Sequence, residues 1–125
     1  MTVAAAIRIT SPDEARVIEH AAEFAALRGA RCFVISVVKG LPHIDLSDEV
    51  QAIVQRNLEL ILAAHASPVI QQGNDIAAAL LAVARGFGVK TLFLQSGTSH
   101  RLGRSIAEQI LHLEPPFDVF VIGSD

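Results

Sequence analysis

The fold class is decided by one stretch of the chain, Arg31-Cys32-Phe33-Val34-Ile35-Ser36-Val37-Val38. Nearly all of its residues are β-branched or otherwise apolar, and polar residues do not alternate with them. Such a continuous run is typical of a strand inside a parallel sheet, where helices cover both faces. The stretch therefore predicts a buried central strand of an α/β protein.

The residues before this strand predict a first strand and a first helix. The apolar run 3–9 indicates a short strand, and Ser11-Pro12-Asp13-Glu14 follows it. In this segment Ser11 can cap a helix, Pro12 suits the first helical turn, and Glu14 completes a capping box with Ser11. We expect the helix to end at Gly29, because glycine readily adopts the left-handed conformation that closes a helix.

The residues after the central strand repeat the same alternation. The predicted elements are a helix that Ser47 caps and that ends near Ala66, a strand over 68–72, a helix from 73–75 to Gly86 or Gly88, a strand over 89–95, a helix from about 104 to 113, and a strand over 117–122. Strict alternation favours a parallel sheet with helices on both faces and right-handed crossovers. Ligands of such sheets bind beyond the carboxyl ends of the strands, where the strand order reverses. The loops after the first and fourth strands are therefore the candidate ligand face.

The loop between the fourth strand and the fourth helix contains glycines, hydroxyl side chains and two arginines. Free N–H groups and the positive end of a helix dipole suit an anion such as phosphate, and Arg101 and Arg104 can converge on it. A solvated surface connection is the alternative hypothesis for this loop. The candidate ligand-binding residues are Thr10, Ser11, Ser96, Gly97, Thr98, Ser99, Arg101, Gly103, Arg104 and Ser105.

The composition limits the kind of protein this can be. With 125 residues, we expect a single domain over 1–125 that folds around its own core. Polar or charged residues interrupt every apolar run before it reaches the roughly 20 residues of a membrane span, so we expect no membrane insertion. The first residues show no basic region of a signal peptide, which favours a cytoplasmic location. The net charge of −3 argues against nucleic acid as a partner.

Catalytic and metal-binding patterns are missing from the sequence. The five histidines have no metal-ligand spacing, and Cys32 lies in an apolar run, as a buried small hydrophobe does. The nucleophile elbow, the P-loop and the dinucleotide-binding fingerprint do not occur. Thr10 and Gln72 stand where a phosphoryl-transfer receiver domain would need acidic residues for magnesium. We therefore expect no catalytic residues and no metal site, and a protein that binds rather than catalyses.

The last predicted strand is apolar and close to the end of the sequence. An open edge strand of this kind risks aggregation, so pairing with a second copy is one expectation, through Phe117, Val119 and Val121. The alternative is a strand that the fourth helix simply covers.

Several segments resemble the universal stress protein family. They are the residues 11–16, 27–38 and 103–111, and together they span most of the chain in the family's order. Further segments resemble the variant of this domain found in the sensor histidine kinase KdpD, namely 57–60, 73–85, 89–91 and 117–121. The resemblance implies a Rossmann-like, five-stranded parallel sheet of strand order 3-2-1-4-5.

The same resemblance implies a homodimer through the last strand and, in some members, ATP or AMP between the loops after strands one and four. Relatives of the KdpD type imply a cyclic dinucleotide as another ligand. This sequence departs from the family's nucleotide motif, because Ile9 stands in place of an acidic residue at the end of strand one. Its glycine loop after Gly97 is also shorter, and Arg104 separates Gly103 from Ser105. These departures weaken the ATP hypothesis while leaving cations for a phosphate.

Two functions from different classes remain open. One is a stress-response or signalling module that binds an adenine or cyclic nucleotide with a degenerate ATP motif. The other is a nucleotide-free dimeric module that docks on a transporter or a sensor kinase. A hydrolase is a more distant alternative, since no catalytic base can be named.

Overall fold

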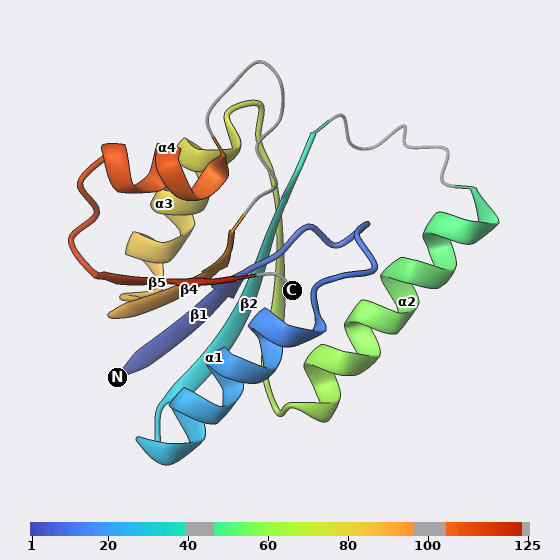
Figure 1. Ribbon diagram of the computed structural model, residues 1–125, viewed down its shortest axis with the longest axis horizontal. Coiled ribbons are helices and arrows are strands. Elements are labelled where there is room, and N and C mark those ends of the chain that lie inside the picture. The colour runs from blue at the N-terminus through green and yellow to red at the C-terminus, as the bar shows by residue number, and fades with distance from the viewer. Residues whose placement is uncertain (40–46, 97–104, 124–125) are drawn as a thin grey trace.

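Five strands and four helices alternate along the part of the chain that the computed structural model describes, residues 1–39, 47–96 and 105–123 (Figure 1). The strands are β1 (Thr2–Ala6), β2 (Arg31–Val38), β3 (Ser67–Gln72), β4 (Thr91–Gln95) and β5 (Asp118–Ile122). The helices are α1 (Ala15–Leu27), α2 (Asp48–Ala63), α3 (Ile76–Gly86) and α4 (Ile106–His112).

All neighbouring strands are parallel, as the alternation of elements predicted, and their order is β3-β2-β1-β4-β5, as the resemblance implied. β1 lies at the centre, where Ala5 is in register with Val34 of β2 and with Phe93 of β4. The strand order reverses between β1 and β4, because β2 and β3 extend the sheet on one side and β4 and β5 on the other. The predicted fold class is therefore confirmed.

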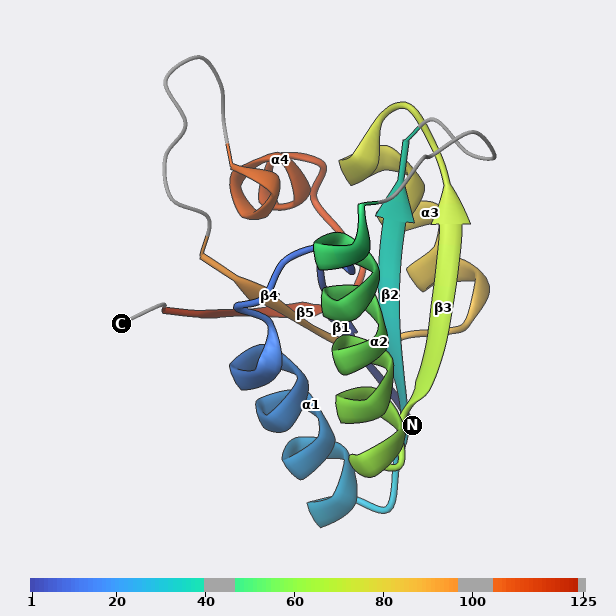
Figure 2. The same cartoon turned by 90° about the vertical axis from the view of Figure 1, so that its right-hand side faces the viewer.

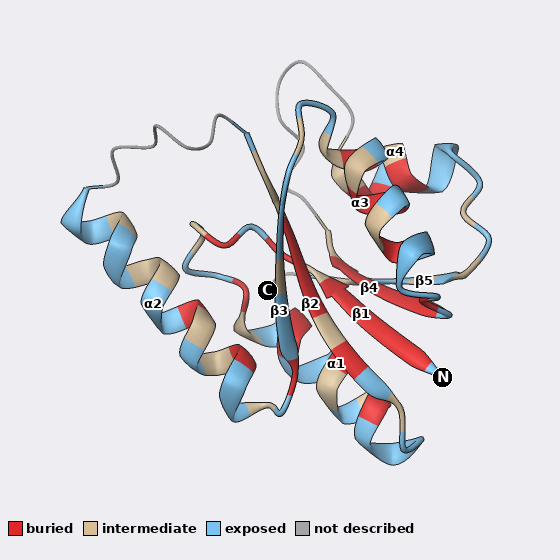
Figure 3. Cartoon of the chain, turned by 180° about the vertical axis from the view of Figure 1, so that it is seen from behind, coloured by how far each residue is buried: buried red, intermediate tan, exposed pale blue. Residues whose placement is uncertain are grey.

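The helices form two layers, with α1 and α2 on one face of the sheet and α3 and α4 on the other (Figure 2). Alternate side chains of β1 divide between two cores: Val3 and Ala5 pack under α1, and Ala4 packs toward α3. Figure 3 shows β1, β4 and much of β2 as buried, in contrast to the exposed edge strand β3. A sheet covered on both faces explains why the central strands are apolar runs without alternation.

Most of the predicted helix boundaries are confirmed by their caps. The side chains of Ser47, Asp75 and Ser105 each accept a hydrogen bond from a backbone N–H in the first turn of α2, α3 and α4. Gly29 follows α1 with a φ of +62°, the conformation expected of a glycine after a helix.

The start of α1 corrects the predicted capping box. The helix begins at Ala15 and not near Pro12, and Glu14 is its N-cap residue without a side-chain cap hydrogen bond. The Ser11 hydroxyl instead accepts from the amide of Asp13, at 3.4 Å, within a local turn. The Glu14 carboxylate accepts from the amide of Arg8, at 3.2 Å, and not from the amide of Ser11, which donates to the carbonyl of Arg8, at 2.9 Å.

Candidate functional site

The carboxyl ends of β1 and β4 lie side by side at the point where the strand order reverses. Thr10 and Ser11 follow β1, Ser96 follows β4, and all three are half-buried. Ser105 is half-buried at the start of α4. The other predicted ligand-binding residues lie outside the described residues, and these are Gly97, Thr98, Ser99, Arg101, Gly103 and Arg104.

The loop after β1 is fixed by hydrogen bonds from two other elements. Asn57 of α2 is only 1% exposed, and its Nδ2 donates to the carbonyl oxygens of Ile9 and Ser11, at 2.8 and 2.9 Å. The amide of Ile9 donates to the Ser36 hydroxyl of β2, at 3.1 Å. Because buried backbone groups need partners, these bonds hold the loop in one conformation at the sheet edge.

Glu14 adds a carboxylate to the same loop and is itself buried, with 7% of its surface exposed. Burial raises the pKa of its carboxyl group, because the charged form loses hydration. Three interactions lower this pKa: a hydrogen bond from the amide of Arg8, the positive charge of Arg8, and a hydrogen bond from the side chain of Ser11. The negative charge of nearby Asp13 raises the pKa further.

Two of the predicted site serines also have structural tasks. The amide of Ser96 donates to the carbonyl of Ile122, at 2.8 Å, which ties the end of β4 to the edge strand β5. The Ser105 hydroxyl oxygen accepts from the amide of Glu108, at 3.1 Å, and so caps α4. The Ser105 hydroxyl proton remains a possible donor, since a hydroxyl donates one hydrogen bond besides those it accepts.

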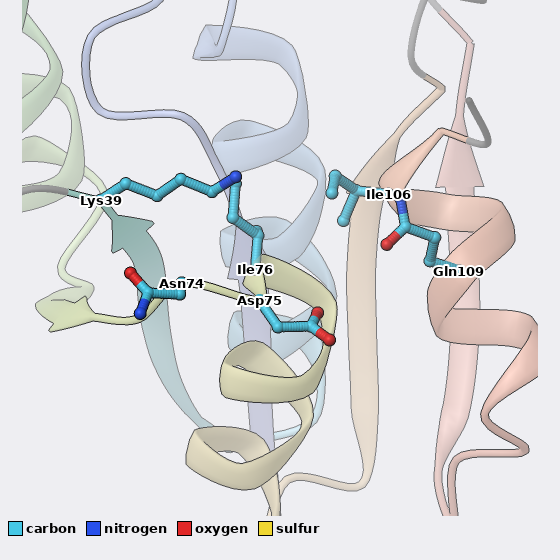
Figure 4. Close-up of a pocket in the computed structure, with 6 residues that line it drawn as sticks. All are labelled: Lys39, Asn74, Asp75, Ile76, Ile106 and Gln109. Atoms are coloured by element: carbon cyan, nitrogen blue, oxygen red, sulfur yellow. The ribbon is translucent and has the colours of Figure 1, made fainter. Parts of the chain in front are cut away.

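An open depression of about 370 Å³ lies at the same edge of the sheet, between the starts of α3 and α4. Figure 4 shows the Lys39 side chain extending from the end of β2 toward the start of α3, and Ile106 and Gln109 lying on α4 opposite it. The residues that line the depression are Lys39, Asn74, Asp75, Ile76, Ile106 and Gln109. The mixture of a cation, a carboxylate, carboxamides and aliphatic side chains can contact both a charged and an apolar part of a small molecule.

Three features of the site were not predicted from the sequence: Asn57, Ser36 and the residues of the depression. Asn57 could have been found, because it is a polar residue three after Val54 and four before Ile61 in the apolar stripe of α2. A polar residue at such a position is either exposed or bonded inside the protein. The depression has no comparable signal, since its residues come from three separate segments of the sequence.

The described residues show no other obvious chemistry. No group of three or more histidine, cysteine, aspartate or glutamate side chains among them could hold a metal ion. Cys32 is buried, and burial raises the pKa of its thiol to about 11, which keeps it protonated and unreactive. None of the helices in the described ranges has the length and apolarity needed to cross a membrane.

The arrangement of sheet, helices and edge loops defines a doubly wound α/β protein with its candidate site at the switch point of the sheet. Models of protein families and curated protein sequences give no match to this chain. Solved structures do match, and several of them are universal stress proteins.

Three of these structures illustrate the likeness. A universal stress protein in complex with cAMP is 18% identical, with a TM-score of 0.75 over 100% of this chain and 98% of the other. A protein of the universal stress protein family from Burkholderia pseudomallei is 23% identical, with a TM-score of 0.68 over 98% and 96%. The universal stress protein from Archaeoglobus fulgidus in complex with dAMP is 22% identical, with a TM-score of 0.67 over 98% and 97%. This chain therefore has the fold of universal stress proteins over the length of these relatives.

Proposed function

We propose that this chain is a non-catalytic stress-response or signalling module of the universal stress protein type, and that it binds a phosphate-bearing adenine or cyclic nucleotide. The observation that carries the proposal is the loop after β1, which Asn57 and Ser36 hold at the switch point of the sheet. A fixed loop at this place is where open α/β sheets bind their ligands. Two proteins of the same fold are in complex with cAMP and dAMP.

The phosphate clamp in this proposal is the segment 97–104, with Arg101 and Arg104 as its cations. Arginine forms charge-assisted hydrogen bonds with phosphate oxygens, and the hydroxyls of Ser96 and Ser105 stand at the two ends of the segment. The depression beside α3 and α4 offers Lys39 as a further cation.

The ATP motif in this proposal is degenerate. The predicted first strand ended at Ile9, but β1 ends at Ala6, and Ile9 lies in the loop that follows it. Ile9 is apolar and only 5% exposed, so this loop offers a ligand no carboxylate at that position. We therefore expect AMP-type or cyclic nucleotides, including a cyclic dinucleotide, to bind better than ATP.

Thermal unfolding with added nucleotides tests the proposal. A ligand at 100 times its Kd stabilises the folded state by about 2.7 kcal/mol, which raises the Tm by several degrees. AMP, cAMP, ATP and a cyclic dinucleotide would be compared on the wild type and on Arg101→Ala and Arg104→Ala, which should lose the shift. Arg85→Ala is the matched control, because Arg85 is exposed in the last turn of α3, far from the carboxyl ends of the strands where the ligand is proposed to bind. If no nucleotide raises the Tm at millimolar concentration, the proposal is wrong.

A second function, a nucleotide-free dimeric module that docks on a transporter or sensor kinase, is favoured by the edge strand β5. Within the described residues this strand pairs only with β4, and Phe120 and Val121 are 46% and 43% exposed. Of the residues predicted for the dimer interface, Val121 is exposed, whereas Phe117 and Val119 pack against the core under α3 and α4.

Light scattering coupled to size exclusion tests this second function. We expect a dimer for the wild type and a monomer for Val121→Lys, because a lysine on an edge strand opposes pairing. Ile70→Lys on the other edge strand, β3, is the control and should remain dimeric, since Ile70 is 50% exposed at the far side of the sheet. A monomeric wild type at about 100 μM would contradict the dimer hypothesis, because stable interfaces have Kd values well below this concentration.

A further inference from the structure

The edge of the sheet at which the strands begin, which we call the amino edge, carries exposed cations. They include Arg31 at the start of β2, Lys90 just before β4 and Arg85 in the last turn of α3. The amide of Arg31 donates to the carbonyl of Met1, at 3.2 Å, and the amide of Lys90 donates to that of Thr2, at 2.9 Å. Arg31 and Lys90 therefore flank β1 on its two sides, with Cα atoms about 10 Å apart, which is two strand spacings.

Two of these cations share a face of the sheet with an exposed aromatic side chain, Phe87. Phe87 follows α3 directly, and its ring stacks on that of Phe33 of β2, with 4.6 Å between the centroids. Because side chains alternate along a strand, Arg31 lies on the same face as Phe33, which packs against the core under α3. Lys90 lies on this face as well, since Leu92 belongs to the same core. Phe87 is 42% exposed there, beside positive charge.

The other face of the sheet ends in the same two kinds of side chain. Leu27, the last residue of α1, is 76% exposed, the largest fraction among the exposed large hydrophobic side chains of the described residues. Arg28 follows it, and its guanidinium carbon lies 3.5 Å from the centroid of the Phe24 ring. The end of α1, the start of β2 and the N-terminus lie together at one extremity of the molecule (Figures 1 and 2). The amino edge thus presents cations and apolar side chains on both faces.

Helix dipoles explain only part of this positive charge. The arginines at the ends of α3 and α1 stand where a cation interacts favourably with a dipole. Arg31 and Lys90 stand at the starts of strands, which have only small dipoles. The carboxylate of Asp118 begins the neighbouring strand β5, but it lies on the opposite face from Lys90, because the next residue, Val119, packs against the core under α3 and α4. These two cations therefore remain available to an anionic partner.

A partner for this surface has to supply negative charge and apolar contact over a broad area. Peptides commonly dock in a groove or along a free strand edge, whereas β2, β1 and β4 each pair with a strand on both sides. The surface of an anionic bilayer supplies negative headgroups above acyl chains, and it attracts clustered cations with apolar side chains among them. Charge and apolar character therefore match a membrane surface on both counts.

We propose that the amino edge is a peripheral docking surface for an anionic lipid membrane. Arg31, Arg85 and Lys90 contact the headgroups, and Phe87 and Leu27 reach the boundary with the acyl chains. The net charge of −3 of the whole chain does not oppose this contact, because screening limits the interaction to charges within about 10 Å of the lipid. The candidate ligand site lies at the opposite ends of the strands, so membrane docking is independent of nucleotide binding.

Sedimentation with lipid vesicles tests the proposal. We expect the protein to bind vesicles of equal parts phosphatidylcholine and phosphatidylserine, and not vesicles of phosphatidylcholine alone. Binding should weaken as the salt concentration rises from about 0.1 to 1 M, because the Debye length falls from about 10 to about 3 Å. No binding to the phosphatidylserine vesicles would overturn the proposal. Binding to polyglutamate without binding to these vesicles would also overturn it, because the surface would then fit an acidic protein.

Charge reversal at the amino edge identifies the surface. Arg31→Glu should weaken vesicle binding by about fivefold to thirtyfold, because each cation near an anionic membrane strengthens binding by about fivefold and the new carboxylate adds repulsion. Lys90→Glu should have a similar effect, which keeps the test decisive if one variant does not fold. Arg56→Glu is the matched control, since Arg56 is exposed in the middle of α2 and its reversal changes the net charge equally. Equal losses in the control and in the two edge variants would overturn the proposal.

A second pair of variants tests the apolar contact. Leu27→Ser should weaken vesicle binding by about tenfold, because the variant has no apolar side chain to bury at this position. Ile70→Ser is the control, since Ile70 is 50% exposed on the edge strand β3, and it should bind as the wild type does. An unchanged affinity of Leu27→Ser would overturn the apolar part of the contact.

Discussion

Replacing Asn57 with alanine should destabilise the protein and loosen the loop after β1 together. Asn57 lies on α2, but both of its hydrogen bonds go to carbonyls of that loop, those of Ile9 and Ser11. The alanine side chain cannot donate, so two carbonyl oxygens at a buried position lose their partner. The variant therefore tests whether the loop is held from a distant element.

The magnitude follows from the cost of a buried polar group without a partner, about 1–3 kcal/mol for each. Because water can reach the half-buried Ser11 more easily than the buried Ile9, we expect a total of about 2–4 kcal/mol. This is a large fraction of the roughly 5–15 kcal/mol by which a domain is stable. The variant should still fold, with a lower midpoint of unfolding.

Urea denaturation would measure the loss as a fall in the midpoint of about 1–2 M. Gln55→Ala is the control on the same helix, since Gln55 is exposed and bonds only to the exposed Glu59; we expect a change within about 0.5 kcal/mol. Hydrogen exchange of the Ile9 amide, which donates to Ser36, should become faster in Asn57→Ala and stay unchanged in Gln55→Ala. Equal stability of the two variants, with an unchanged exchange rate at Ile9, would refute the reasoning.

Substitutions at four further residues test single features of the fold. Gly73→Ala should cost about 1–3 kcal/mol in urea denaturation, because its new Cβ would meet the Cβ of Ala79 at 2.8 Å; a neutral result would mean that α3 shifts freely. His65→Gly should raise the free energy of unfolding by up to about 1 kcal/mol, since His65 has a φ of +58°, which suits glycine better than histidine. Gly29→Ala should lower the free energy of unfolding, because Gly29 has a φ of +62°. A change of the same sign in both variants would contradict this explanation. Ser105→Ala should cost about 1 kcal/mol in thermal unfolding through the lost cap of α4, whereas Ser105→Asp should retain most of the stability.

The sheet and its helices could be predicted from the sequence because their signals are local. The run 31–38 became β2 with the predicted bounds, and Ser47, Asp75 and Gly29 mark helix ends through bonds or backbone angles within a few residues. The predicted capping box at the start of α1 was wrong, because Glu14 bonds to a residue outside the capping motif. Glu14 has the right spacing from Ser11, yet its carboxylate accepts from Arg8.

The candidate site could be predicted only in part. The alternation of strands and helices was enough to place Thr10, Ser11 and Ser96 at the ends of neighbouring strands. The residues that hold this site were not predicted, because Asn57 is 48 positions from Ile9 and Ser36 is 27 positions from it.

Local sequence signals were enough to predict the order of the elements, the caps of α2 and α3 and the parallel sheet, since periodicity and capping act over a few neighbouring residues. The tertiary structure alone decided which polar groups meet inside the protein. It joined Asn57 to the loop after β1 and left oxygens of Glu14 and Gln95 buried without donors. Such partners are selected by the packing of distant segments, because a buried polar atom must find its bond wherever the fold brings a donor within about 3 Å.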